Sequence, residues 1–281
     1  MELVALFHDI VYSPRGWNNE EESIKYFKSY LSNNDDRADV RDIINTIRDT
    51  TYTSEVLLCP LLSEIFCSEL LDLHSLTLTK PSEIIESETN VLKEFQWCNY
   101  PEYRRQRLEF LKNFKRLKVS ENVIDFLTNY RPKIGVYPGS FLPFHIGHLN
   151  ILEQAEKVFD KVIIAMGKNP SKMADDANIV SVKSTLPYHE IVNYDGLLSD
   201  YLKSINYADV TVIRGLRSGY DLDYEMNQLR ILEDCGCQLP VAYFLCSKET
   251  THVSSSMIRG LSNFNNSNIM KYIPSKYNYV S

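Results

Sequence analysis

The second half of this chain of 281 residues carries short apolar runs that alternate with segments long enough to form helices. The runs are Ile134–Tyr137, Val162–Met166, Val210–Ile213 and Val241–Leu245. Runs of this length predict strands buried on both faces, and strands that alternate with helices form parallel sheets. Helices are expected over residues 149–159, 197–205, 222–232 and 255–261. The pattern predicts an α/β domain with a Rossmann-like parallel sheet that is covered by helices on both faces.

The first half of the chain has a different pattern, with amphipathic stretches and no glycine-punctuated hairpins. Apolar residues recur at three- and four-residue spacing over 21–30, 40–48 and 103–117. This spacing is typical of helices that bury one face. The pattern changes near Arg131-Pro132, so we expect two domains, an all-α domain over residues 1–131 and the α/β domain over 132–281.

A glycine-containing segment, YPGSFLPFHIGH, directly follows the first predicted strand and spans Tyr137–His148. A helix is expected to begin at its end, where unpaired backbone N–H groups and the helix dipole attract an anion. Gly147 lets a phosphate approach the backbone, and the imidazoles of His145 and His148 can donate to its oxygens. Taken singly, one histidine would more simply be a surface residue and the other a helix cap. The whole segment is better explained by a phosphate site.

Three further segments carry polar residues next to predicted strands or at a predicted helix start. They are NPSK ending at Lys172, IRGLR over Ile213–Arg217 leading to DLDYEM over Asp221–Met226, and VSSSMIR over Val253–Arg259. Ligands of open α/β sheets bind at the carboxyl ends of strands, and arginine forks suit phosphate geometry. Serines at a helix start can cap the helix and also contact a phosphate.

These four blocks, in this order, resemble the signature of the H-x-G-H nucleotidyltransferases. The R-G-L-R and D-x-x-Y-E-M blocks resemble those of pantetheine-phosphate adenylyltransferases in particular. The resemblance covers about Ile134–Tyr277 and implies adenylyl transfer from ATP to 4′-phosphopantetheine, which gives dephospho-coenzyme A and pyrophosphate, with Mg²⁺ offsetting the pyrophosphate charge. Three alternatives stay open: a nicotinate or nicotinamide mononucleotide adenylyltransferase, an HD-type phosphohydrolase with a nucleotide-sensing C-terminal domain, and a catalytically inactive binding module.

The same resemblance implies roles for individual residues. His148 and Lys172 would be the catalytic residues, and His148 would stabilise the transition state. Lys172 would also hold the acceptor, together with Ser140, Leu198 and Arg214. The ATP contacts would be Ser140, Phe141, His148, Gly215, Leu216, Arg217, Glu225, Thr250, Ser254, Ser255 and Ser256. Leu142 stands where the family usually carries an aspartate, Thr250 stands where an aromatic residue is common, and the segment 173–189 is shorter than usual. Leu142 removes a carboxylate beside the phosphates, which bears on metal binding and loop geometry, and Thr250 implies weaker nucleotide binding than is typical of the family.

The segment Leu6–Pro14, LFHDIVYSP, resembles the small helical HD-type phosphohydrolases, in which a His-Asp pair on one helix helps to hold a divalent metal. His8 and Asp9 are the candidate metal ligands, and Asp72 and His74 are weaker candidates. The family's earlier histidine has no counterpart before His8. We therefore expect the helical domain to be HD-like but degenerate and non-catalytic.

Composition excludes several other classes of protein. A formal net charge of −7 and the lack of a basic patch argue against a nucleic-acid partner. No apolar run approaches the roughly 20 residues that a membrane helix needs. The six cysteines lack zinc-type pairing, so reduced thiols are expected. We expect a cytoplasmic enzyme that binds ATP and phosphopantetheine and no membrane, and the sequence leaves open whether it forms a homo-oligomer.

Overall fold

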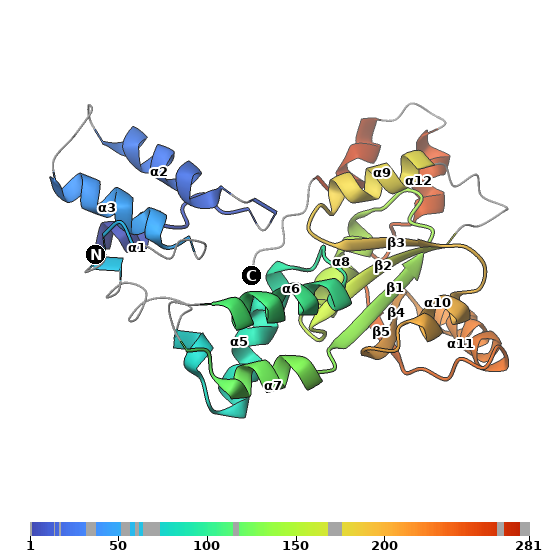
Figure 1. The fold of residues 1–281 in the computed structure, drawn as a ribbon. Helices are drawn as coiled ribbons and strands as arrows, with labels where there is room; N and C mark the ends of the chain where they lie inside the picture. Colours follow the sequence, from blue (N-terminus) through green and yellow to red (C-terminus); the bar gives the residue numbers. More distant parts are fainter. Residues whose placement is uncertain are drawn as a thin grey trace. The chain divides into compact units, whose positions relative to one another are not determined.

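The computed structural model describes residues 2–13, 15–16, 18–31, 38–51, 57–59, 62–63, 74–114, 118–167, 176–262 and 267–275 (Figure 1). The chain divides into two compact units. A helical unit comprises residues 1–88 and 104–129, and a sheet unit comprises residues 89–103 and 130–281.

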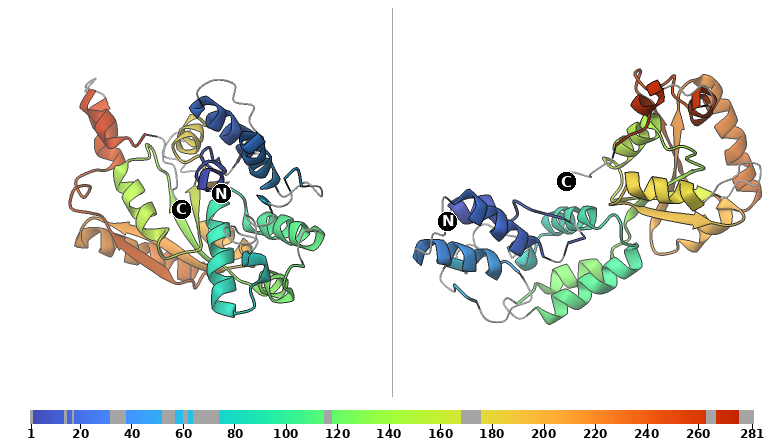
Figure 2. Two further views of the ribbon diagram at one scale, coloured as in Figure 1. Left: turned by 90° about the vertical axis from the view of Figure 1, so that its left-hand side faces the viewer. Right: turned by 90° about the horizontal axis from the view of Figure 1, so that it is seen from above.

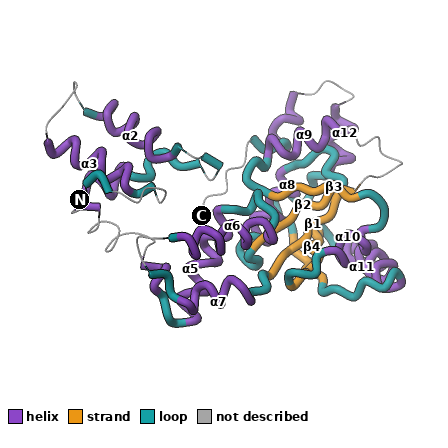
Figure 3. Tube along the Cα trace, in the orientation of Figure 1, coloured by secondary structure: helices purple, strands orange, loops and turns teal. Residues whose placement is uncertain are grey.

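The described part of the helical unit contains helices and no strand (Figure 3). Its helices are α1 (Glu2–Phe7), α2 (Asn19–Tyr30), α3 (Ala38–Asp49), the 3₁₀ helix η1 (His74–Thr77), α7 (Glu121–Asn129), and parts of α5 (Pro81–Glu94) and α6 (Tyr100–Asn113). Phe7, Phe27 and Ile47 belong to one apolar cluster, and Leu111 and Val123 belong to another. The all-α prediction agrees with these elements, whereas the likeness to HD-type proteins stays a prediction.

The sheet unit is built on five parallel strands in the order β3-β2-β1-β4-β5. The strands are β1 (Lys133–Gly139), β2 (Lys161–Gly167), β3 (Glu190–Tyr194), β4 (Asp209–Leu216) and β5 (Val241–Leu245). The central strand β1 pairs Val136 with Ile163 of β2 and Val212 of β4. The four predicted strands are confirmed. The edge strand β3 was not predicted, because it is short and its residues are only partly buried.

Helices cover both faces of this sheet (Figures 1 and 2). They are α8 (Ile146–Ala155), α9 (Asp176–Thr185), α10 (Leu198–Ser204), α11 (Gly219–Asp234) and α12 (Ser255–Ser262), followed by the 3₁₀ helix η2 (Ser267–Tyr272). Alternate residues of β2 serve opposite faces: Val162 and Ile164 pack in the cluster of α8 and α9, whereas Ile163 and Ala165 pack in the cluster of α10. Among the described residues, no helix is both long enough and apolar enough to span a membrane.

The short segment 89–103 packs with the sheet unit although it precedes β1 in sequence. The Gln96 side chain makes hydrogen bonds to the backbone at the start of β2, as a neighbouring strand would. Its Oε1 accepts from the Val162 N–H at 3.0 Å, and its Nε2 donates to the Asp160 carbonyl at 2.8 Å. Lys161, whose side chain is fully buried, donates to the Gln96 carbonyl and pairs with Glu190 Oε2 at 3.1 Å. These contacts fix the segment to the amino end of the sheet, opposite to the end where β1 leads into the loop before α8.

Candidate active site

The loop after β1 leads into helix α8, and two histidines cap that helix. His145 is the N-cap residue, and its Nδ1 accepts from the Gly147 N–H at 3.1 Å. His148 Nδ1 accepts in turn from the His145 N–H at 3.3 Å. A Cβ on Gly147 would lie 3.0 Å from His145 Cε1, so the glycine leaves room for the His145 ring to fold back over the helix start. The helix cap is therefore made by the same two side chains that the sequence assigns to phosphate.

This arrangement fixes which nitrogen of each ring faces outward. Because both Nδ1 atoms accept backbone N–H groups, a neutral ring carries its proton on Nε2. The rings of His145 and His148 stack with centroids 3.7 Å apart. Burial, together with the Arg217 charge, lowers the pKa of His145 to about 4. Burial, and to a smaller extent His145 and Arg217, also keep the pKa of His148 well below its usual value. Both imidazoles are therefore neutral Nε2–H donors at pH 7.

Aromatic side chains pack around His148 and hold its imidazole in place. The Phe141 ring is buried and meets the His148 ring edge-on, at a centroid distance of 5.0 Å and an angle of 82°. Tyr137 packs against Phe141 at 5.1 Å, and Phe144 lies 5.4 Å from His148. Side chains of this size leave the imidazole few alternative orientations.

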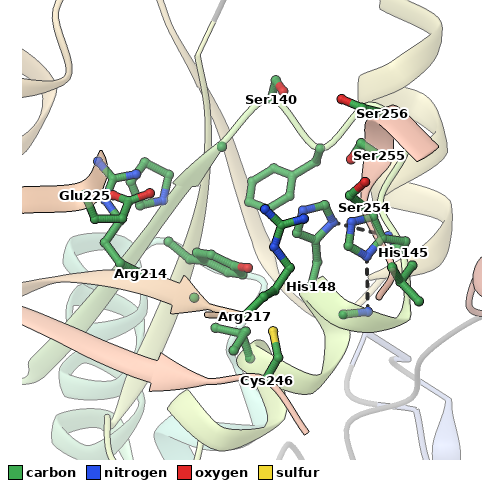
Figure 4. Close-up of a pocket in the computed structure, with 18 of the residues that line it drawn as sticks. Ser140, His145, His148, Arg214, Arg217, Glu225, Cys246, Ser254, Ser255 and Ser256 are labelled. Carbon is green, nitrogen blue, oxygen red and sulfur yellow. Dashed lines mark hydrogen bonds and ion pairs between the residues drawn. The ribbon is translucent and has the colours of Figure 1, made fainter. Parts of the chain in front are cut away.

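A second helix N-terminus faces the same space (Figure 4). Ser254 caps α12, since its Oγ accepts from the Met257 N–H at 3.1 Å. Ser255 Oγ donates to the Pro143 carbonyl at 3.0 Å, and the Arg259 guanidinium donates to the Leu142 carbonyl, so α12 is tied to the loop after β1. The Leu142–Pro143 peptide bond in that loop is cis. Two helix dipoles therefore converge where α8 and α12 begin, which favours an anion between them.

Two arginines at the carboxyl end of β4 are each held by a carboxylate of α11. Arg214 Nε lies 3.1 Å from Glu225 Oε2, and burial raises the pKa of Glu225 although the Arg214 charge opposes this. Arg217 donates to Asp221 from both Nε, at 3.0 Å, and Nη2, at 2.9 Å, and these hydrogen bonds lower the pKa of Asp221. The Arg217 side chain extends toward His148 (Figure 4). Both cations are thus oriented by fixed partners.

These groups line a cavity of about 470 Å³. Nine of the residues predicted to contact ATP line it: Ser140, Phe141, His148, Gly215, Arg217, Glu225, Ser254, Ser255 and Ser256. Leu216 and Thr250 do not line the cavity, and both are buried. The cavity is also lined by His145, which the sequence placed at the phosphate site, and by Arg259 and Cys246, to which the sequence assigned no ATP contact. The position of Cys246, directly after a predicted strand, is the sequence signal that could have indicated it.

A second cavity of about 630 Å³ adjoins the first. It extends between the β3–α10 connection and α11, and three of the predicted acceptor contacts line it, namely Ser140, Leu198 and Arg214. Ser140 and Arg214, with Pro138 and Gly139, line both cavities. The predicted contact Lys172 lies outside the described residues. Two ligands could therefore meet beside Ser140 and Arg214.

The predicted metal ligands of the helical unit lie just after α1 rather than within a helix. His8 Nε2 pairs with Asp9 Oδ2 at 3.0 Å, and this interaction raises the pKa of His8. Asp72 lies outside the described residues, as does the side chain of His74. In the part of the chain that the structure describes, no group of three or more His, Cys, Asp or Glu residues could hold a metal ion.

A parallel sheet whose first strand leads into a helix capped by two histidines defines a nucleotidyltransferase-like fold, and a family model described as cytidylyltransferase-like matches residues 136–261. Phosphopantetheine adenylyltransferase of Geotalea daltonii is 33% identical over 139 residues, covering 47% of this chain and 85% of that protein. The enzymes of Buchnera aphidicola and Mycoplasma capricolum are 30% and 34% identical, covering 53% and 45% of this chain and 92% and 94% of those proteins. The chain belongs to the family of the phosphopantetheine adenylyltransferases, and its residues 136–261 form a cytidylyltransferase-like domain.

Proposed function

We propose that this chain transfers the adenylyl group of ATP to the phosphate of 4′-phosphopantetheine, which gives dephospho-coenzyme A and pyrophosphate. The observation that carries the proposal is the pair of adjoining cavities that share Ser140 and Arg214. One cavity has two helix N-termini and two imidazole donors, as a triphosphate requires. The other is larger and more apolar, with leucine and isoleucine side chains along its wall, as a pantetheine arm requires.

The chemistry needs no covalent enzyme intermediate. An oxygen of the acceptor phosphate attacks the α-phosphorus of ATP, a new P–O bond forms, and the bond to pyrophosphate breaks. The acceptor phosphate is already anionic at neutral pH, so no general base is required and catalysis rests on positioning and charge stabilisation. The Nε2–H group of His148 would donate to an oxygen on which charge develops in the transition state.

Other residues would hold the two substrates. Ser140, Leu198 and Arg214 would hold the acceptor, with Lys172 as a further cation on its phosphate. Arg217 and the α12 start would hold ATP through its phosphates. These ATP contacts combine a charged fork with backbone N–H groups, which suits phosphate oxygens.

Magnesium is proposed as a companion of ATP rather than as an ion held by the protein. Glu225 is the one carboxylate that lines the nucleotide cavity among the described residues, and Arg214 already pairs with it. Mg²⁺ is commonly bound through substrate phosphates with few protein ligands. When bound, it would supply positive charge to the leaving pyrophosphate.

The decisive assay follows pyrophosphate release with ATP, Mg²⁺ and one acceptor at a time. Release that depends on phosphopantetheine supports the proposal, whereas release only with nicotinate or nicotinamide mononucleotide would move the activity to that acceptor. The His148→Ala variant should turn over roughly 10²-fold more slowly or worse. His252→Ala is the matched control, because His252 is exposed and lines neither cavity. Turnover of His148→Ala at the rate of the control would refute the role of His148.

For the helical half, we propose a non-catalytic domain with a degenerate HD-type pair at His8 and Asp9. The supporting observation is that these two side chains pair with each other. Release of inorganic phosphate from nucleotides without any acceptor, abolished in His8→Ala, would contradict this proposal.

A further inference from the structure

Two polar side chains in the acceptor cavity have no role in the proposed transfer. Ser199, on α10, is only 1% exposed, and its Oγ has no hydrogen-bond partner among the described residues. Cys235, at the end of α11, carries a free and partly exposed thiol. Both residues line the cavity of about 630 Å³. A buried hydroxyl without a partner is costly unless a ligand satisfies it, so Ser199 marks the cavity as a binding site that extends beyond Arg214.

One face of helix α11 lines this cavity, so the rise of the helix measures distance along it. Gln228, Ile231, Leu232 and Cys235 follow the i, i+3, i+4, i+7 spacing of one helix face, and all four line the cavity. Glu225, one turn before Gln228, pairs with Arg214 at the shared end of the two cavities. At a rise of 1.5 Å per residue, Cys235 lies about 15 Å along the helix from Glu225. Arg214, the partner of Glu225, and Cys235 both line the cavity, so about this length separates its phosphate-binding end from Cys235.

The proposed acceptor matches this length and ends in the same chemical group. Fully extended, phosphopantetheine spans about 16 Å from phosphorus to sulfur by ordinary bond lengths and angles. With its phosphate beside Ser140 and Arg214, its terminal thiol reaches Cys235. Its amide groups pass the wall that contains Ser199, and an amide carbonyl can accept from the Ser199 hydroxyl. The cavity thus brings two sulfur atoms together.

We propose that Cys235 is a redox-sensitive modification site, which captures the oxidised, disulfide form of the acceptor by thiol–disulfide exchange. This inference rests on the proposed function. The Cys235 thiolate attacks one sulfur of the ligand disulfide, that S–S bond breaks, and a new S–S bond joins Cys235 to one pantetheine arm. The other arm leaves as a thiolate and takes up the proton that Cys235 lost. Cys235 is oxidised and one arm is reduced, so no further oxidant is required.

A contact from a neighbouring helix holds the end of α11 in place. Lys203 Nζ, on α10, donates to the Cys235 carbonyl at 2.8 Å. This contact positions the Cys235 backbone beside the cavity, and positioning by the bound phosphate supplies the selectivity of the exchange.

The adduct can be detected directly by mass spectrometry. The full chain is reduced, freed of reductant and incubated with the disulfide of phosphopantetheine, and its intact mass is measured without reductant. One arm should add at Cys235, and dithiothreitol should remove it. Pantetheine disulfide, which lacks the phosphate, and glutathione disulfide should react at least tenfold more slowly. Cys235→Ser should abolish the adduct, while Cys59→Ser, which removes a thiol of similar exposure in the helical unit, should retain it.

Each outcome discriminates between the site and the proposed activity. An adduct that survives in Cys235→Ser, or equal rates with glutathione disulfide, would overturn the inference. Pyrophosphate release with reduced phosphopantetheine is measured in parallel on the unmodified chain. Turnover without any adduct would refute the exchange and leave the proposed function standing. A phosphate-dependent adduct on a chain that releases no pyrophosphate would refute adenylyl transfer and leave the site at Cys235. Absence of both signals would refute both.

Discussion

Raising the pH from 7 to 9 tests whether His145 and His148 act as neutral donors. Both Nδ1 atoms accept backbone N–H groups, and burial holds both pKa values below the ordinary 6.5. A histidine that acted as an imidazolium with an ordinary pKa would be about 24% protonated at pH 7 and about 0.3% at pH 9. Its contribution would fall about 75-fold. Neutral imidazoles lose nothing over this range, so we expect kcat/KM for ATP to change less than about twofold.

The assay is the initial rate of pyrophosphate release at saturating phosphopantetheine and constant Mg²⁺. Phosphate monoesters have their second pKa near 6, so above pH 7 the substrates are almost fully ionised and contribute little to the profile. His148→Gln, which keeps a neutral N–H donor and does not titrate, is the matched control and should give a parallel profile. A fall of tenfold or more in the wild type that is absent from His148→Gln would refute the neutral-donor reasoning.

Two further predictions concern stability. Gly135→Ala should destabilise the sheet unit by about 1–3 kcal/mol, because the new Cβ would lie 2.5 Å from Ile213 Cδ1 and 2.7 Å from Phe159 Cδ2; an unchanged midpoint in thermal unfolding followed by circular dichroism would contradict this. The pKa of His145 is about 4 in the folded chain and 6.5 when unfolded, so stability is lost as the pH falls from 6.5 toward 4, by about 2 kcal/mol between pH 7 and pH 5. His145→Asn keeps a capping oxygen but does not titrate, so its free energy of unfolding in urea should fall by about 2 kcal/mol less than that of the wild type between pH 7 and pH 5. An equal dependence on pH in the two proteins would exclude the mechanism.

The sequence predicted most of the sheet unit, because its central strands are buried on both faces. Ile134–Tyr137 and Val162–Met166 form continuous apolar runs that polar loops do not imitate. The edge strand Glu190–Tyr194 mixes polar and apolar residues, so its pattern is weak. The contact of segment 89–103 with β2 depends on pairings such as Gln96 with Val162, which join residues far apart in sequence. Local periodicity carries no information on such pairings.

The sequence predicted which motif segments meet at the candidate site, but it did not predict how their side chains are oriented. The segment that contains His148 and the segment that contains Arg217 indicated a phosphate site, and both line one cavity. The sequence could not indicate that Asp221 orients Arg217, since an acidic residue early in a helix is also common for dipole reasons. It also could not reveal which imidazole nitrogen faces the ligand, because that depends on the hydrogen bonds at the start of α8.

The packing of Gln96 against the start of β2 sets a practical limit on how this protein can be cut. A fragment beginning at Ile134 would retain the four motif blocks but would lose the Gln96 carbonyl that accepts from the buried Lys161. Among the described residues, Lys161 would keep Glu190 as its polar partner, and Ile163 on the same strand would lose part of its apolar cover. Such a fragment should express poorly or aggregate. A fragment that starts upstream of α5 would keep the Gln96 contacts that cover the amino end of the sheet.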